Sequence, residues 1–176
     1  MRTVVLEIVR GGAATLLGLY AGGVFFAVIA PSVGRLPGPV YVPYWKALNT
    51  DYGRVMPPFL LTCLALLVAT CALSYGRGRT AFWLSVAATV LVLATIVLTV
   101  TQMEPLNRLV DGWSPDDAPA DFAAVRGRWL ALHTVRTVLA VLAFVSLLTA
   151  QGTDRPKPPH ARPATAVVGV GVDAAR

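Results

Sequence analysis

Residues 81–103 read AFWLSVAATVLVLATIVLTVTQM, an apolar stretch without a charged side chain, a glycine or a proline. About 20 helical residues, each rising ~1.5 Å, are needed to cross the ~30 Å hydrocarbon core of a bilayer. An amphipathic helix lying on a membrane surface would carry a strongly polar face, which this stretch lacks. The stretch therefore predicts a transmembrane helix.

Three further apolar runs of similar length predict three more such helices. They are Gly11–Val33, Pro57–Tyr75 and Trp129–Gln151, and only the last contains basic side chains, His133 and Arg136. Hydrophobic residues make up 56% of the 176 and charged residues only 14%, with a mean hydropathy of +0.65. These values lie far from those of soluble domains. The sequence predicts an all-α fold, an integral membrane four-helix bundle with two longer extracytoplasmic loops.

The expected domain covers residues 1–150, and its helices are expected at about 11–33, 57–75, 81–103 and 120–150. Within the first helix, Gly18 and Gly22 are spaced so that a neighbouring helix can approach closely. Tyr20 lies between them and is interpreted as a buried or interfacial tyrosine. Residues 151–176 are rich in proline and arginine and predict a disordered tail without a core of its own.

The net charge of +6 does not indicate a nucleic-acid partner, because the Lys and Arg residues are scattered over the loops and the tail and form no basic stripe. The expected partner is the lipid bilayer. A small excess of Lys and Arg in the segments on the N-terminal side of the membrane favours a multi-pass protein of the cell membrane with both termini cytoplasmic. The oligomeric state has no signature in the sequence.

Residues 126–136, RGRWLALHTVR, carry the most unusual polar pattern of the chain. Trp129, His133 and Arg136 are spaced four and then three apart, which places them on one face of a helix. An arginine inside the hydrocarbon costs at least ~2.5–3.5 kcal/mol, so its guanidinium should face protein or water and have a partner. Asn49, Glu104 and Asn107 are expected at the same membrane face and within reach of one cavity.

Two interpretations of this polar face remain open. In a functional interpretation, the arginine favours an oxyanion or phenolate, a neutral His133 acts as general base, and Trp129 offers an aromatic surface to a flat ligand. In a structural interpretation, His133 and Arg136 form hydrogen bonds that hold two helices together. A single histidine with one carboxylate falls short of the three or four ligands of a zinc or iron site, so no metal is expected.

Three ordered motifs point to a known family. They are Trp45-x-x-x-Asn49, Pro105-Leu106-Asn107 and Arg126-x-x-Trp129-x-x-x-His133-x-x-Arg136-Thr137. With the four predicted membrane helices, they resemble the anthrone oxygenase-like family of small four-helix membrane proteins, many of which are catalogued as a domain of unknown function. The resemblance covers roughly residues 10–150.

The resemblance implies oxidation of a lipophilic aromatic molecule of the anthrone or phenol type by dioxygen, without a cofactor. It implies catalytic roles for His133 as base, Arg136 as anion stabiliser and Asn107 as an orienting group. Substrate binding would fall to Trp129, Asn49 and Trp45. The alternative function is that of a non-catalytic membrane protein that binds a lipid or quinone or assists a partner complex.

Overall fold

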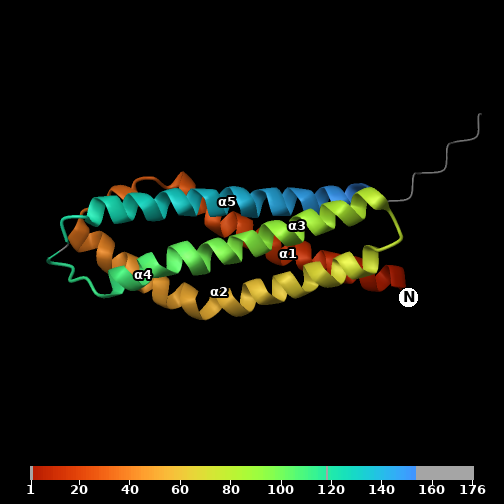
Figure 1. The fold of residues 1–176 in the computed structure, drawn as a ribbon, viewed down its shortest axis with the longest axis horizontal. Helices are drawn as coiled ribbons and strands as arrows, with labels where there is room; N and C mark the ends of the chain where they lie inside the picture. Colours follow the sequence, from red (N-terminus) through yellow and green to blue (C-terminus); the bar gives the residue numbers. More distant parts are fainter. Residues whose placement is uncertain (1, 118, 154–176) are drawn as a thin grey trace, which may run out of the picture.

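The computed structural model describes residues 2–117 and 119–153, and this part of the chain is helical and contains no β-strand (Figure 1). Its elements are α1 (Arg2–Ile29), the short 3₁₀ helix η1 (Val33–Arg35), α2 (Gly38–Ser74), α3 (Arg79–Leu98), the π-helical turn η2 (Thr99–Met103), α4 (Glu104–Asp111) and α5 (Phe122–Thr153). The predicted all-α fold is confirmed.

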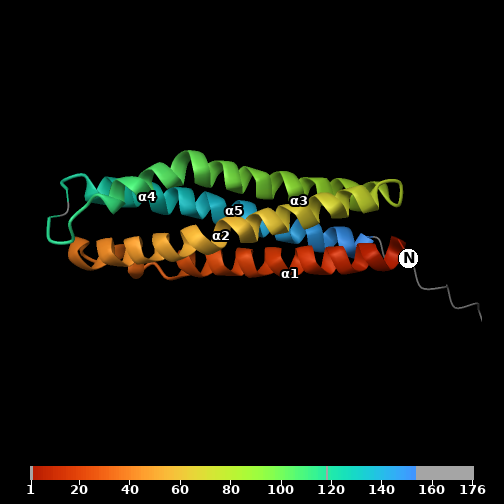
Figure 2. The ribbon, with the colours of Figure 1, turned by 90° about the horizontal axis from the view of Figure 1, so that it is seen from below.

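Four antiparallel rods form the bundle, with α3, η2 and α4 together making one of them (Figures 1 and 2). Contacts join α1 to α2, α2 to α3, α3 to α5 and α5 to α1, which closes a ring. Each rod is long and apolar enough to cross a membrane. We call the end that carries η1 and residues 112–117 and 119–121 the loop end, and the end with the start of α1 and the α2–α3 turn the terminal end. The four-helix membrane bundle is confirmed.

Alanines and leucines fill the interior of the bundle, and many other apolar side chains lie on its outer surface. Ala13 and Leu17 of α1, Leu67 of α2 and Ala140 of α5 are fully buried. Large aliphatic residues such as Val138 and Val145 are about half exposed, at 52% and 51%. In lipid this arrangement carries no hydrophobic penalty, and helix association relies on close packing of small residues and on polar contacts.

The second helix begins much earlier than predicted. Residues 35–56 were expected to form a loop with at most a short helix over residues 44–49, yet α2 starts at Gly38 and continues through Pro43, Pro57 and Pro58. Each proline removes the hydrogen bond to the carbonyl four residues before it. For the last two prolines those carbonyls belong to exposed residues, so water or lipid headgroups can satisfy them. Burial of Trp45 and its neighbours on the other face of α2 stabilises this helical extension.

The other helix bounds also differ from the prediction, by smaller amounts. Helix α1 covers Arg2–Ile29 and so starts nine residues earlier than predicted, and α5 covers Phe122–Thr153. The third rod continues past Met103 through α4, because the π-helical turn beside Pro105 accommodates a proline that has no N–H to donate. The predicted disordered tail lies, beyond Thr153, outside the described residues.

Close helix approach is found at Gly18 and not at Gly22. A Cβ on Gly18 would lie 3.1 Å from the Phe144 ring of α5, whereas a Cβ on Gly22 would meet nothing within 4 Å. We therefore expect Gly18→Leu to lower the free energy of unfolding by about 1–3 kcal/mol through overpacking, and Gly22→Leu to change it little. Thermal unfolding of both variants in detergent measures this, and equal effects would contradict the packing at Gly18.

Candidate functional site

The side-chain amide of Asn107 joins three helices at the loop end. Its Oδ1 accepts hydrogen bonds from the indole N–H of Trp45 on α2, at 3.1 Å, and from that of Trp129 on α5, at 3.0 Å. Both indoles pack against each other with ring centroids 5.3 Å apart. Because an amide oxygen has two acceptor positions, Asn107 satisfies both tryptophans at once.

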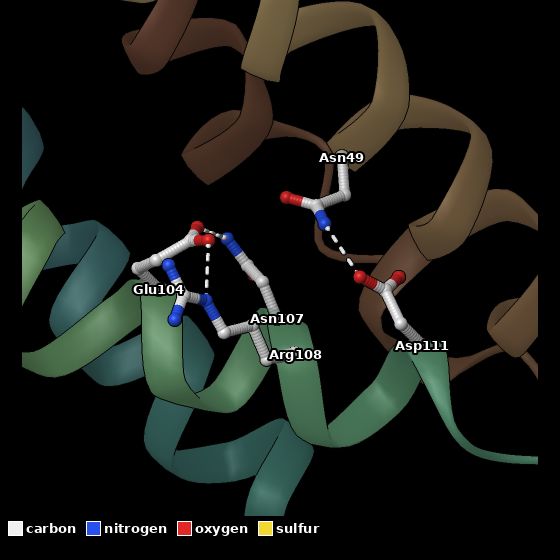
Figure 3. A network of polar contacts seen from close by, with 5 residues as sticks. All are labelled: Asn49, Glu104, Asn107, Arg108 and Asp111. Atoms are coloured by element: carbon white, nitrogen blue, oxygen red, sulfur yellow. Dashed lines mark hydrogen bonds and ion pairs between the residues drawn. The ribbon is translucent and has the colours of Figure 1, made fainter.

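A second set of contacts surrounds Asn107 on α4 (Figure 3). Its Nδ2 donates to Glu104 at 3.4 Å, and the same carboxylate pairs with Arg108 at 3.0 Å. Asn49 of α2 donates instead to Asp111 at 3.3 Å, on an exposed part of the surface. Figure 3 shows this Asn49 pair apart from the Glu104 group, so Asn49 does not share the contacts of Asn107.

Trp129, His133 and Arg136 lie on one face of α5, as their spacing predicts. The Trp129 and His133 rings are stacked, with centroids 5.0 Å apart and an angle of 13° between planes. His133 Nε2 lies 3.0 Å from the Val24 carbonyl of α1, and Arg136 donates to His133 Nδ1 at 2.6 Å. A carbonyl only accepts and a guanidinium only donates, so these partners place the single ring proton on Nε2 and make the imidazole neutral.

Arg136 is a cation without an acidic partner among the described residues. Glu104, the carboxylate expected at the same membrane face, pairs with Arg108 instead. The partner that Arg136 does have, His133, belongs to its own helix rather than to another segment. Its Nε is buried and makes no hydrogen bond. One donor of this guanidinium is therefore available for an acceptor that the side chains around it do not supply.

Arg126 was quoted in the sequence motif without a role, and the structure shows what it contacts. It donates to the Leu36 carbonyl at 2.7 Å, just after η1. Its guanidinium also lies over the rings of Tyr41 and Phe122, 5.5 Å and 4.8 Å from their centroids. Cation–π contacts of this kind favour an arginine over a lysine. Arg126 thus fastens the segment between α1 and α2 to the start of α5.

Lys46 makes the corresponding contact to the other loop, which no sequence signal indicated. Its ammonium donates to the Trp113 carbonyl at 2.6 Å. Trp113 also packs edge-on against Phe122, with centroids 6.0 Å apart. The two cations therefore hold both connecting segments over the aromatic cluster around Trp45 and Trp129.

Comparison with protein families decides the relationship of this chain. The family model described as anthrone oxygenase matches residues 45–146, which is more than half of the chain. This chain belongs to the anthrone oxygenase family. The comparison with curated proteins gave no match, and neither did the comparison with solved structures.

The matched segment of this anthrone oxygenase family member contains most of the polar network. Five of the six predicted site residues form one continuous series of contacts: Trp45, Asn107, Trp129, His133 and Arg136. The sixth, Asn49, lies outside it. Helix α1, which supplies the Val24 carbonyl, precedes the matched segment. A backbone carbonyl has no sequence signature, so its part in the network was not predictable.

Two hollows lie near the network of this family member. One, of about 270 Å³, is an apolar groove between α1 and α5, lined by Phe25, Val28, Thr134, Thr137, Val138, Val141 and Leu142. The other, of about 410 Å³, is lined by Val100, Glu104, Pro105 and Arg108. Neither lining includes His133 or Arg136. The groove does come close to His133. Thr137 lines the groove, and its hydroxyl donates to the same Val24 carbonyl that His133 Nε2 contacts.

The described residues of this family member include no group of three or more His, Cys, Asp or Glu side chains placed to hold a metal ion. Cys63 and Cys71 are both free thiols. The chemical groups that the network does contain are a neutral imidazole, a guanidinium with one unused donor, two indoles and one amide. These groups can accept a proton, stabilise an anion and hold a flat aromatic ring.

Proposed function

We propose that this member of the anthrone oxygenase family is a membrane oxidoreductase that oxidises a lipophilic phenolic aromatic molecule with dioxygen. The observation that carries the proposal is the arrangement on α5, where an indole, a neutral imidazole and a guanidinium follow one another on one partly buried face. Membership of the anthrone oxygenase family supports the choice of substrate class. A lipophilic substrate also suits a protein whose helices cross a bilayer.

In the proposed reaction an activated ring methylene becomes a carbonyl. His133 Nδ1 takes one proton from the methylene, and the electron pair left on carbon is shared with the phenolic oxygen, whose negative charge Arg136 stabilises. The carbanion adds dioxygen, and the resulting peroxide takes the proton back from His133. Loss of water from the hydroperoxide leaves the carbonyl. The balance is CH₂ plus O₂ to C=O plus H₂O, with His133 restored.

This sequence of steps requires the hydrogen bond between Arg136 and His133 to open. At 2.6 Å the guanidinium covers the lone pair of Nδ1 that must receive the proton. A substrate oxygen that draws the guanidinium toward itself uncovers that lone pair. Binding of the anion and exposure of the base are then one event, so the base is free only when a substrate is present.

The apolar groove between α1 and α5 is the proposed route from the lipid. Its walls are almost entirely apolar, and its volume of about 270 Å³ suits a small fused-ring molecule. At its floor Thr137 shares the Val24 carbonyl with His133, so a small shift of that contact connects the groove to the base.

The alternative, a non-catalytic protein that binds a lipid or quinone or assists a partner complex, is favoured by one observation. Both nitrogens of His133 and the amide oxygen of Asn107 already have partners within the protein. Such saturation is what polar contacts between membrane helices require for stability alone. Binding of a quinone without oxygen consumption would support this alternative.

For the membrane orientation we infer that the terminal end faces the cytoplasm in the cell membrane. Arg77 lies in the α2–α3 turn at this end, Arg79 begins α3, and Arg10 of α1 donates to Ser74 at the end of α2. Positive charge in short loops favours the cytoplasmic side.

The proposal is tested by oxygen uptake of the purified protein with a model anthrone. We expect one quinone formed for each dioxygen consumed by the wild type. Val138→Trp, which fills the groove, should lower the rate several-fold, while Val145→Trp should not. Both valines are equally exposed on the same helix, and only Val138 lines the groove. Absence of uptake by the wild type, with and without added divalent metal, would exclude this substrate class.

A further inference from the structure

Two polar atoms on facing helices are buried without a hydrogen-bond partner. They are the hydroxyl of Tyr20 on α1 and the Nε of Arg136 on α5. Tyr20 is only 5% exposed, and it lies in the apolar core among residues such as Val24, Leu60 and Cys63. Buried polar groups in native proteins are nearly always paired, so two unpaired groups on facing helices call for a common explanation.

The two groups lie at the same depth of the bundle. Tyr20 precedes Val24 by one helical turn, and Arg136 follows His133 by one turn. Because α1 and α5 are antiparallel (Figures 1 and 2), both steps lead from the His133–Val24 hydrogen bond toward the terminal end. Tyr20 and Arg136 therefore both lie one helical turn from the His133–Val24 contact, on the side of the terminal end.

The chemistry of the two groups selects one kind of ligand atom. The Nε–H of an arginine can only donate, and a tyrosine hydroxyl in this apolar layer has a proton to donate as well. Two donors that share a layer suit a single acceptor oxygen. In a low-dielectric setting, and with one donor positively charged, an anionic oxygen is bound far more strongly than a neutral one.

We propose that Tyr20 and Arg136 form a two-donor site for one anionic oxygen, the phenolate oxygen of the bound aromatic molecule. This inference rests on the proposed function and adds Tyr20 as a binding residue. Tyr20 lies outside the matched segment 45–146, so the family comparison does not assign it a role. The site also supplies the reason for Arg136 to leave His133, because the phenolate offers this guanidinium a charged partner.

The test uses the full chain in detergent and two probes, an anthraquinone that bears a phenolic hydroxyl and the parent anthraquinone without one. The absorption of the hydroxylated probe moves to longer wavelength on ionisation, so it reports both binding and the bound form. Tyr20→Phe keeps the ring and its packing and removes only the hydroxyl. Tyr44→Phe, at a 42% exposed position on α2, is the matched control.

We expect Tyr20→Phe to bind the hydroxylated probe about 10- to 100-fold more weakly, the range for one hydrogen bond to a charged group, and to bind the parent quinone as the wild type does. The spectrum of the remaining complex should lose its phenolate component. Equal affinity of Tyr20→Phe and wild type for the hydroxylated probe would overturn the inference while the oxygen uptake of the wild type stands. A wild type that neither binds the probes nor consumes oxygen would overturn the proposed function itself.

Discussion

His133→Gln should lower the oxygen-uptake rate by about 10²–10⁴-fold, the usual contribution of a positioned general base. Glutamine, like the neutral imidazole, carries both a donor group and an acceptor group, so it can keep a hydrogen bond to the Val24 carbonyl or to Arg136. It cannot take a proton at neutral pH. The loss is therefore expected in kcat, with little change in the affinity for a quinone or in thermal stability.

A smaller variant at the same position separates chemistry from packing. His133→Ala leaves space beside the Trp129 ring, on which the imidazole now stacks. Free imidazole in the assay should restore part of the lost rate in this variant and none in the wild type. Full turnover by His133→Gln would instead assign the histidine to the contact between α1 and α5 alone.

The helices could be predicted from the sequence because a transmembrane helix requires about 20 consecutive apolar residues, and such long apolar runs are rare in other structures. The shared face of Trp129, His133 and Arg136 followed from helical spacing in the same way. Both conclusions depend only on local geometry. The structure agrees with them because neither requires knowledge of which helices are neighbours.

The parts that depend on neighbouring helices were not predictable. Pro57 and Pro58 are a good signal for a helix start, yet packing of Trp45 and Tyr41 keeps the chain helical on their N-terminal side. Asn49 and Asn107 looked equivalent in sequence. Only the arrangement of α2, α4 and α5 decides that one faces the two indoles and the other an exposed carboxylate.

This difference between the two asparagines gives the largest expected effect on stability. Asn107→Leu removes the oxygen that accepts both indole N–H groups, from Trp45 and Trp129. Each donor left without a partner costs about 1–3 kcal/mol, so we expect a loss of about 2–6 kcal/mol in the free energy of unfolding. A typical domain has only about 5–15 kcal/mol in total. Thermal and denaturant unfolding in mild detergent, followed by tryptophan fluorescence, measures the change.

Asn49→Leu is the matched control, because its lost hydrogen bond to Asp111 lies at the exposed surface and should cost no more than about 0.5 kcal/mol. Asn107→Asp should fall between the two variants. Its carboxylate still accepts from both indoles, but it loses the donor to Glu104 and places a second negative charge beside it. If Asn107→Leu were no less stable than Asn49→Leu, the two tryptophans would have other acceptors. The contact among α2, α4 and α5, which positions Trp129 against His133, would then not depend on the side-chain amide of Asn107.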